Sequence, residues 1–235
     1  MNKANIPTNA NYLNSILVES TDSYTAISHG SIISKTQDLL SKHNINILGE
    51  SYHHCNDGKI AQGKYLLGVN NADFGLELAW QNSVNKQVSF KYAVGSQTFV
   101  CTNSACFGTL GSYKRIHTGI ADVEAYETME DFIQHLEENF TEQVELYKKM
   151  KEIEITKKTC AGLIGRMFMD DEIITITQLG IINKELHNPS FDYGVENTVY
   201  NLFQHCTHSF KEVTPRTWLP KQLELSDFFI NEFSL

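Results

Sequence analysis

The chain has 235 residues, of which 41% are hydrophobic, so it is long enough to bury a sizeable core in one large domain. Its 28 acidic and 19 basic residues give a net charge of −9, which argues against a general binder of duplex DNA, because phosphate contacts need clustered Lys and Arg. The five cysteines are odd in number and form no C-x-x-C pair, which argues against a disulfide framework and against a zinc site built from paired cysteines.

The sequence shows no signal for export or for insertion into a membrane. Its N-terminal stretch is polar and lacks both a basic flank and a sustained apolar core. No later apolar run approaches the roughly 20 residues that a membrane span needs. We therefore expect a cytoplasmic protein with no membrane partner.

The first predicted elements are one helix and a hairpin. Residues 32–43 are expected to form a short helix, because their apolar side chains recur near one side of a helix. A strand is predicted over 45–55 and a returning strand over 64–69. The Asn-Asp-Gly sequence at 56–58 predicts a tight turn between them, since these residues tolerate positive φ.

Three further strands complete a predicted meander. Apolar and polar residues alternate over 76–80, which is typical of a half-buried strand. Two more strands are expected over 88–94 and 98–101, joined by a turn at 95–97. The sequence therefore predicts an antiparallel meander of about four to six strands, with one face covered by helices.

The second half of the chain is predicted to be helical. Residues 121–151 carry an apolar stripe at three- and four-residue steps, with acidic residues in the first turns and lysines in the last, as the helix dipole favours. Shorter helices are expected over 157–169, 172–186 and 194–212. Residues 216–235 mix acidic residues with phenylalanines and are interpreted as a tail that docks on its own domain or on another protein.

These predictions define an α+β fold. An N-terminal segment with a short helix spans 1–45, and a single α+β domain spans 46–215. That domain is β-rich over 46–118 and helical over 121–213, and the C-terminal tail follows it.

Several short motifs within residues 50–118 and one late helix carry a family resemblance. They are Glu50–His54, Gln81–Ser83, Lys86, Ala93–Gly95, Phe99–Cys101, Asn103, Arg115, His117, Thr118 and the helix at 197–211. In these motifs the chain resembles the phage/plasmid-like proteins gathered as domain of unknown function 932. The resemblance implies a phage setting in the cytoplasm of an infected bacterium, and it supplies no catalytic residue.

The chain departs from that family pattern at the turn after residue 80. The family has Arg before Asn-Ser and His-Asp before Lys, whereas here Gln81 and Val84-Asn85 stand in those places. If the family residues form an ion pair or hold a ligand, this chain has lost or replaced that interaction.

Catalytic and metal-binding interpretations are weaker than structural ones. His53 and Cys55 would share one side of a strand, but no second paired motif completes four metal ligands. A thiolate–imidazole pair of Cys101 and His117 lacks a third group to orient it. The acidic run at 170–172 is also where helix N-termini favour carboxylates. We expect no metal, no cofactor and no catalytic residue, although enzyme activity stays open.

A polar and basic set of residues forms the candidate nucleic-acid site. A meander would bring its turns and the segment around residue 115 to one edge, where amides and cations meet phosphates and a tyrosine stacks on a base. The alternative is that the Asn and Ser residues cap turns and the aromatic rings fill the core. The set comprises Asn82, Ser83, Asn85, Lys86, Lys91, Tyr92, Asn103, Lys114, Arg115 and His117.

Two functional hypotheses follow. The first is a non-enzymatic phage protein of DNA metabolism that binds single-stranded nucleic acid in replication or recombination. The second is a phage protein that binds a host defence or replication factor, or another phage protein, through its acidic surface or its tail. The tail residues proposed for that contact are Asp227, Phe228, Phe229, Phe233 and Leu235. The oligomeric state is left open, with a homo-oligomer among the alternatives.

Overall fold

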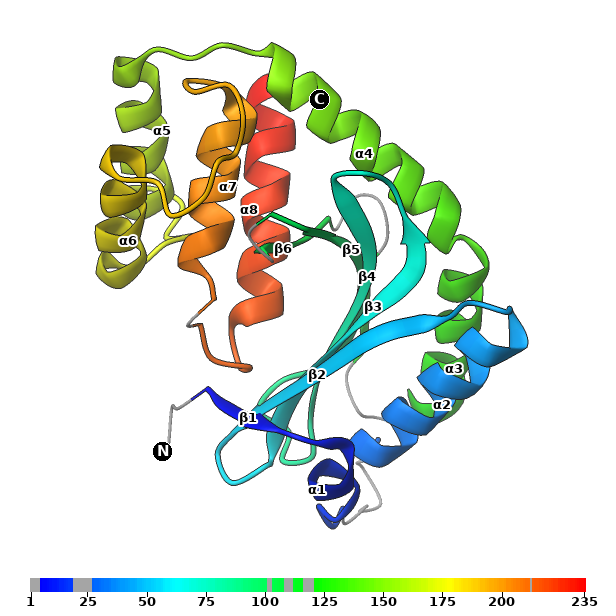
Figure 1. The fold of residues 1–235 in the computed structure, drawn as a ribbon. Helices are drawn as coiled ribbons and strands as arrows, with labels where there is room; N and C mark the ends of the chain where they lie inside the picture. The colour runs from blue at the N-terminus through cyan, green and yellow to red at the C-terminus, as the bar shows by residue number, and fades with distance from the viewer. Residues whose placement is uncertain (1–4, 19–26, 101–102, 108–111, 116–120, 212) are drawn as a thin grey trace.

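The computed structural model describes residues 5–18, 27–100, 103–107, 112–115, 121–211 and 213–235 (Figure 1). The strands are β1 (Ile6–Thr8), β2 (Ile47–Cys55), β3 (Ile60–Asn70), β4 (Phe74–Ser83), β5 (Phe90–Thr98), β6 (Asn103–Cys106) and β7 (Ser112–Arg115). The helices are α1 (Ala10–Asn14), α2 (His29–Lys42), α3 (Ala121–Gln134), α4 (Leu136–Glu152), α5 (Lys157–Met169), α6 (Ile176–His187), α7 (Val199–Ser209) and α8 (Trp218–Phe233).

The strands form one antiparallel sheet. Strands β1 to β6 are neighbours in chain order, and β7 also pairs with β5. The outer edge of β5 is shared, since Phe90 to Ala93 pair with β7 and Gly95 to Thr98 pair with β6. The predicted α+β class, with a meander and C-terminal helices, is confirmed.

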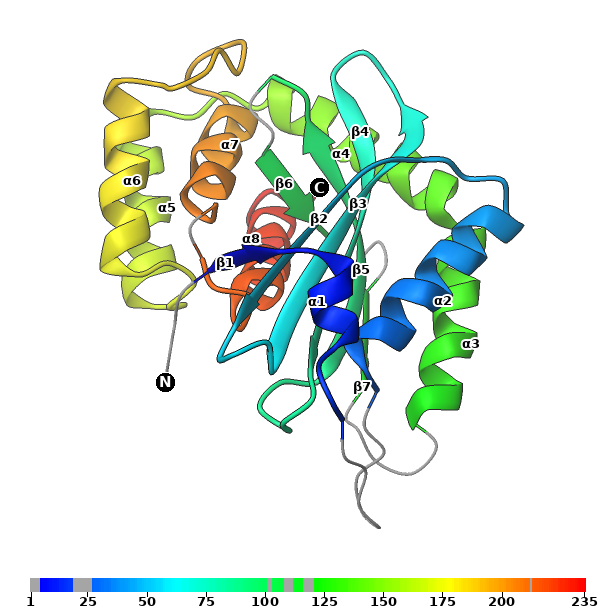
Figure 2. The same cartoon turned by 60° about the horizontal axis from the view of Figure 1, so that its bottom comes forward.

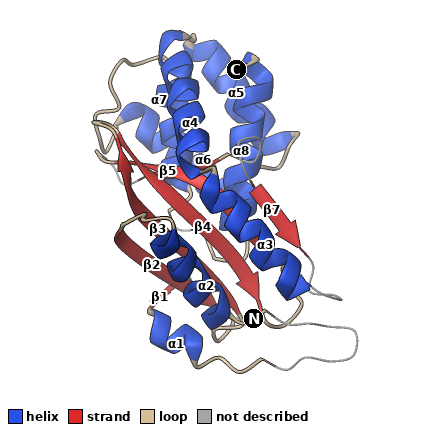
Figure 3. Cartoon of the chain, turned by 90° about the vertical axis from the view of Figure 1, so that its right-hand side faces the viewer, coloured by secondary structure: helices blue, strands red, loops and turns tan. Residues whose placement is uncertain are grey.

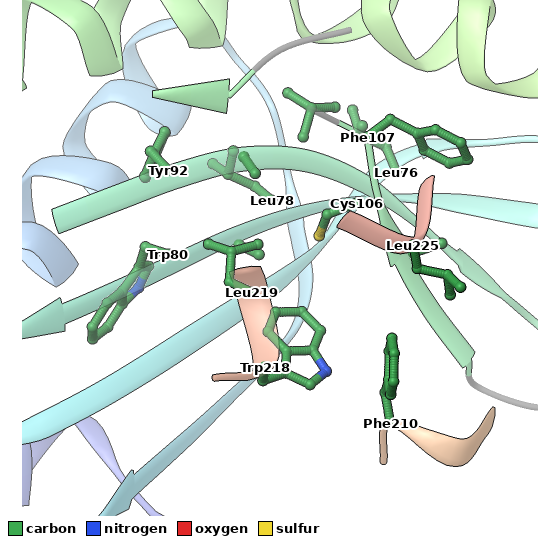
Figure 4. Close-up of a cluster of buried hydrophobic side chains, with 14 of the residues drawn as sticks. Leu76, Leu78, Trp80, Tyr92, Cys106, Phe107, Phe210, Trp218, Leu219 and Leu225 are labelled. Atoms are coloured by element: carbon green, nitrogen blue, oxygen red, sulfur yellow. The ribbon is translucent and has the colours of Figure 1, made fainter. Parts of the chain in front are cut away.

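Helices cover both faces of the sheet rather than one. Helices α2, α3 and α4 lie on one face, and α7 and α8 lie on the other side, with α5 and α6 outside α7 (Figures 1 and 3). On the first face, the hydroxyl groups of Tyr92 and Ser96 contact Thr36 of α2 and Tyr147 of α4. On the second face, the side chains of Leu219 and Leu225 of α8 lie beside the strands (Figure 4).

Strand β4 is buried on both sides as a result. All ten of its residues are buried, although the alternation over 76–80 predicted a half-buried strand. The register places Gly63 beside Trp80, and a Cβ on Gly63 would lie 2.4 Å from Nε1 of the indole. The glycine therefore provides the space in which the largest side chain of the sheet packs.

The predicted turn at 95–97 lies inside β5, so that prediction is wrong. Gly95 is paired with Cys106 of β6, and a Cβ there would lie 2.6 Å from the carbonyl oxygen of Ala105. Glycine at this position allows the backbone of β6 to approach β5 closely, and close backbone approach is a common reason for a glycine inside a strand.

The predicted helix over 121–151 is two helices that meet at His135. The break allows α3 to pack on α2 and β7 while α4 packs on β4, β5 and α7. The helices predicted over 172–186 and 194–212 begin later than expected, at Ile176 and Val199. Thr175 and Thr198 are their N-cap residues.

The C-terminal segment docks on its own domain, which is one of the two alternatives that the sequence left open. Residues 216–235 contain α8, whose buried positions Trp218, Leu219, Gln222, Leu225 and Phe229 follow helical spacing. Pro220 lies in the first turn, where a missing N–H costs little. The five residues assigned to a partner are instead within or against the core: Phe228 and Phe229 are buried, and Asp227, Phe233 and Leu235 are half-buried.

We expect Gly95→Ala to lower the free energy of unfolding by about 1–3 kcal/mol, because the added methyl group would overlap the backbone of β6. The matched change Gly162→Ala lies on α5 where nothing is within 4 Å, so it should leave stability unchanged or raise it by up to about 1 kcal/mol. Urea unfolding followed by circular dichroism measures both. Equal effects of the two substitutions would contradict the close approach at Gly95.

Candidate nucleic-acid interface

Two loops lie side by side at one end of the sheet. The β2–β3 turn occupies residues 56–59 and the β4–β5 loop occupies residues 84–89. The backbone N–H of Val84 donates to the carbonyl oxygen of Lys59 at 3.0 Å, and the side-chain amide of Asn56 donates to Gln87 at 3.4 Å. The two loops therefore form one joined surface.

The conformation of both loops follows from their residue types. Asn56, Asp57 and Gly58 have φ values of 54°, 55° and 80°, and Lys86 has a φ of 64°. Asn, Asp and Gly adopt this left-handed region most readily, so the predicted tight turn at 56–58 is confirmed. The positive φ of Lys86 belongs to the tip of the second loop, where its side chain is exposed.

The segment before α8 is joined to this end of the sheet through the side-chain amide of Gln81. The ammonium group of Lys91 donates to Gln81 Oε1 at 3.3 Å, and the amide nitrogen of Gln81 donates to the carbonyl oxygen of Pro215. The segment before α8 is thereby held against the sheet, and it places Arg216 next to Cys55. Burial raises the pKa of the Cys55 thiol, and the nearby Arg216 lowers that pKa in part.

We call Lys59, Lys86, Lys91 and Arg216 the basic turn cluster. Lys59, Lys86 and Arg216 are exposed, and Lys91 is half-buried. The backbone register adds two more basic positions beside it, because β7 pairs Lys114 with Lys91 and Arg115 with Phe90. Four segments that are distant in sequence therefore bring basic residues to one end of the sheet.

The charge of this region differs from that of the whole chain. Residues 47–115 contain six basic and four acidic residues, whereas the chain has 19 basic and 28 acidic residues. In the two loops the acidic residue is Asp57. His54 adds no positive charge at neutral pH, because burial lowers the pKa of its imidazole.

Four of the ten predicted site residues are buried and engaged inside the fold. The amide nitrogen of Asn82 donates to the carbonyl oxygen of Ile27 at 2.8 Å and lies 3.1 Å from Nδ1 of His29. The hydroxyl group of Ser83 bonds to the backbone N–H and carbonyl of Val88. Asn82 therefore ties the segment before α2 to the sheet, and Ser83 shapes the β4–β5 loop.

Tyr92 and Asn103 are also buried, so they do not belong to the candidate binding surface. The hydroxyl group of Tyr92 donates to Thr36, and burial raises the pKa of this phenol. Because the ring is buried, it is not available to stack on a base. Asn103 lies at the other end of β5, opposite Thr98, and donates to the carbonyl oxygen of Gln204 at 3.1 Å. Both residues were predicted from polarity or aromaticity, which does not distinguish a ligand contact from an internal one.

The remaining predicted residues divide into two groups. Asn85, Lys86 and Lys91 lie together in the β4–β5 loop and at the start of β5. Lys114 and Arg115 are placed by their backbone pairing, and His117 lies outside the described residues.

Sequence reasoning missed two members of the basic turn cluster. Lys59 directly follows the Asn-Asp-Gly turn, so its position at the tip of a hairpin was readable from the sequence. Arg216 carried no such signal, because tertiary contacts bring it to the sheet, among them the contact between Gln81 and Pro215.

The fold and this end of the sheet define an α+β protein with an antiparallel sheet between helical layers and a basic turn cluster. The chain belongs to the family Domain of unknown function (DUF932), whose model matches residues 18–217. No curated protein and no solved structure matches the chain.

Neither a metal centre nor a membrane span is found among the described residues. In the part of the chain that the structure describes, no group of three or more His, Cys, Asp or Glu residues could hold a metal ion. None of the described helices combines the length and apolar character that crossing a membrane needs.

We expect Asn82→Ala to lower the free energy of unfolding by about 1–3 kcal/mol, because it removes a buried hydrogen bond to the carbonyl oxygen of Ile27. Asn231→Ala, at an exposed position of α8, is the control and should change stability by less than about 0.5 kcal/mol. Urea unfolding compares the two variants. A neutral Asn82→Ala would show that its amide is not needed by the fold.

Proposed function

We propose that this chain is a phage-encoded, non-enzymatic protein of DNA metabolism that binds single-stranded nucleic acid at the basic turn cluster. The observation that carries the proposal is the convergence of Lys59, Lys86, Lys91 and Arg216 from separate segments onto one end of an otherwise acidic chain. Such a cluster offers several cations to consecutive phosphates, which is the main source of affinity for nucleic acid.

The charge balance favours a single strand over a duplex. Duplex DNA carries one negative charge per about 1.7 Å, so a chain of net charge −9 is repelled more strongly by a duplex than by one strand. The amide of Asn85 lies in the same loop as Lys86 and can bond to a phosphate or to an unpaired base edge. Contacts to phosphate, rather than stacking on Tyr92, are the basis of this proposal.

The biological setting of the proposal comes from the family resemblance. A phage protein of this kind would act in the cytoplasm of an infected bacterium, during replication or recombination, when single strands are exposed. These processes require proteins that hold a strand without reading its sequence, which suits a cluster of cations better than a set of base-specific contacts.

The double variant Lys59→Glu/Lys86→Glu should weaken binding of a fluorescent oligothymidylate by about tenfold or more at low salt. Each lost phosphate contact should also reduce the slope of log affinity against log salt by about 0.7, so the slope should fall by about 1.4. Fluorescence anisotropy between about 50 and 200 mM salt measures both quantities.

The matched control is Lys149→Glu/Lys158→Glu, which makes the same charge change at exposed positions of α4 and α5. It should alter affinity by no more than about twofold, since only the long-range field changes. A wild-type protein that does not bind at low salt, or an equal loss in the control, would overturn the proposal.

A second candidate function is binding of a basic protein, and a specific surface favours it. Helices α3 and α4 present an acidic exposed face that comprises Asp131, Glu137, Glu138, Glu142 and Glu145. Complementary charge would attract a phage or host protein with a basic surface. The C-terminal residues first assigned to such a partner are used within the fold, so this acidic face replaces them in the proposal.

Affinity purification from nuclease-treated host lysate separates the two candidates. If a basic protein is the partner, Glu138→Lys/Glu142→Lys should lose a protein that the wild type retains, because opposite charges become like charges. Lys59→Glu/Lys86→Glu should retain that protein. Loss of all retained material on nuclease treatment would count against the protein partner.

A further inference from the structure

Helices α5 and α6 lie on the far side of α7 from the sheet (Figures 1 and 2). A pocket lies in this helical part of the molecule. It is formed between α5, α6 and α7 and has a volume of about 630 Å³. This volume falls in the range of small-molecule sites, which span roughly 300–1,000 Å³. The basic turn cluster does not contribute to its lining.

The walls of the pocket are mainly apolar. Aliphatic side chains come from all three helices and from Ile155, two residues before α5. They would pack against the faces of a ring system. Cys160 and Ala161 of α5 complete the wall on one side. The aliphatic residues are Ile155, Ile164, Leu179, Leu186 and Leu202.

Polar groups line the α7 side of the pocket. Nε2 of His205 lies 3.1 Å from Oδ1 of Asn201, and both residues line the pocket. His205 is only 1% exposed, and burial lowers the pKa of its imidazole, so the ring is neutral at pH 7. The pair therefore offers an uncharged donor and acceptor at the base of an apolar cleft.

Behind His205 lies a second buried polar group. Oε2 of Glu185 is 3.9 Å from Nδ1 of His205, and Glu185 is itself held by the N–H and hydroxyl groups of Ser190 at 3.1 and 2.5 Å. Nδ1 of His205 has no hydrogen-bond partner among the described residues. Moving the proton to Nδ1 would direct it at Glu185 and would turn Nε2 into an acceptor. Asn201 would then turn its amide nitrogen to Nε2 and its oxygen toward a ligand, so the tautomer of His205 sets which amide atom the ligand edge meets.

The charged residues that line the pocket favour neither an anionic nor a cationic ligand. Lys157 and Glu196 both line it and have opposite charge. The other polar lining includes the amides of Asn183 and Asn197. Side-chain amides pair with adjacent donor and acceptor atoms, as they do with the N6 and N7 edge of adenine.

We propose that this pocket binds an uncharged, flat heteroaromatic molecule of nucleoside size with adjacent hydrogen-bond donor and acceptor atoms. The walls hold the faces of the ring, and Asn201 with His205 bonds to its edge. The proposal does not depend on the basic turn cluster, which lies elsewhere on the molecule. A free nucleoside and a base within an oligonucleotide share this chemistry, and the experiment separates them.

Adenosine is the probe, and saturation-transfer NMR with the full chain is the measurement. The wild type should bind adenosine with a dissociation constant below about 1 mM. Ala161→Trp places an indole in the pocket from an exposed position of α5 and should weaken binding about tenfold or more. Lys158→Trp, at an exposed position of the same helix outside the lining, should bind as the wild type does.

Alkylation of Cys160 provides a second readout that does not depend on a variant. This half-buried thiol lines the pocket, so adenosine should slow its reaction with N-ethylmaleimide, followed by peptide mass spectrometry at that residue. Protection by a short oligoadenylate but not by adenosine would assign the site to a base within a strand. Absence of saturation transfer and of protection in the wild type, or equal binding by a folded Ala161→Trp, would overturn the proposal.

Discussion

The burial of strand β4 on both faces is the constraint on which the rest of this structure depends. All ten residues of the strand are inside, so each polar group on it must find a partner within the protein. Gln81 bonds to the segment before α8, Asn82 bonds to the segment before α2, and Ser83 closes the β4–β5 loop. The polar end of β4 therefore ties both terminal parts of the chain to the sheet.

The same contacts produce the candidate site. Because Gln81 holds Pro215 and also accepts from Lys91, Arg216 and Lys91 reach the end of the sheet where the two loops carry Lys59 and Lys86. Acidic residues are concentrated instead on α3 and α4, whose outer face is exposed. A chain that is acidic as a whole thus has a basic end and a separate acidic helical face.

The helical part around α5, α6 and α7 has a different character from the sheet. Its buried polar residues, Glu185 and His205, are not paired at hydrogen-bond distance with each other, and they lie behind a cleft with apolar walls. Inside the sheet, Asn82, Tyr92 and Ser104 donate to a backbone carbonyl, a hydroxyl group and a carboxylate. The proposed small-molecule pocket in the helices rests on its volume and apolar walls, whereas the proposed phosphate-binding surface on the sheet rests on the convergence of cations.

Local patterns in the sequence determined the α+β class, the antiparallel meander, the Asn-Asp-Gly turn and most helices, because turn preference and apolar periodicity act over a few residues. Tertiary structure alone decided which polar residues are buried: Asn82 and Asn85 are the same residue type three positions apart, yet the first is buried on β4 and the second lies in a loop. It also decided that Gly95 lies inside β5, where the backbone of β6 approaches it closely, rather than in a turn. The same is true of residues 218–233, which form a helix that packs on the core. Burial depends on which distant segments cover a residue, and that information is not contained in its neighbours along the chain.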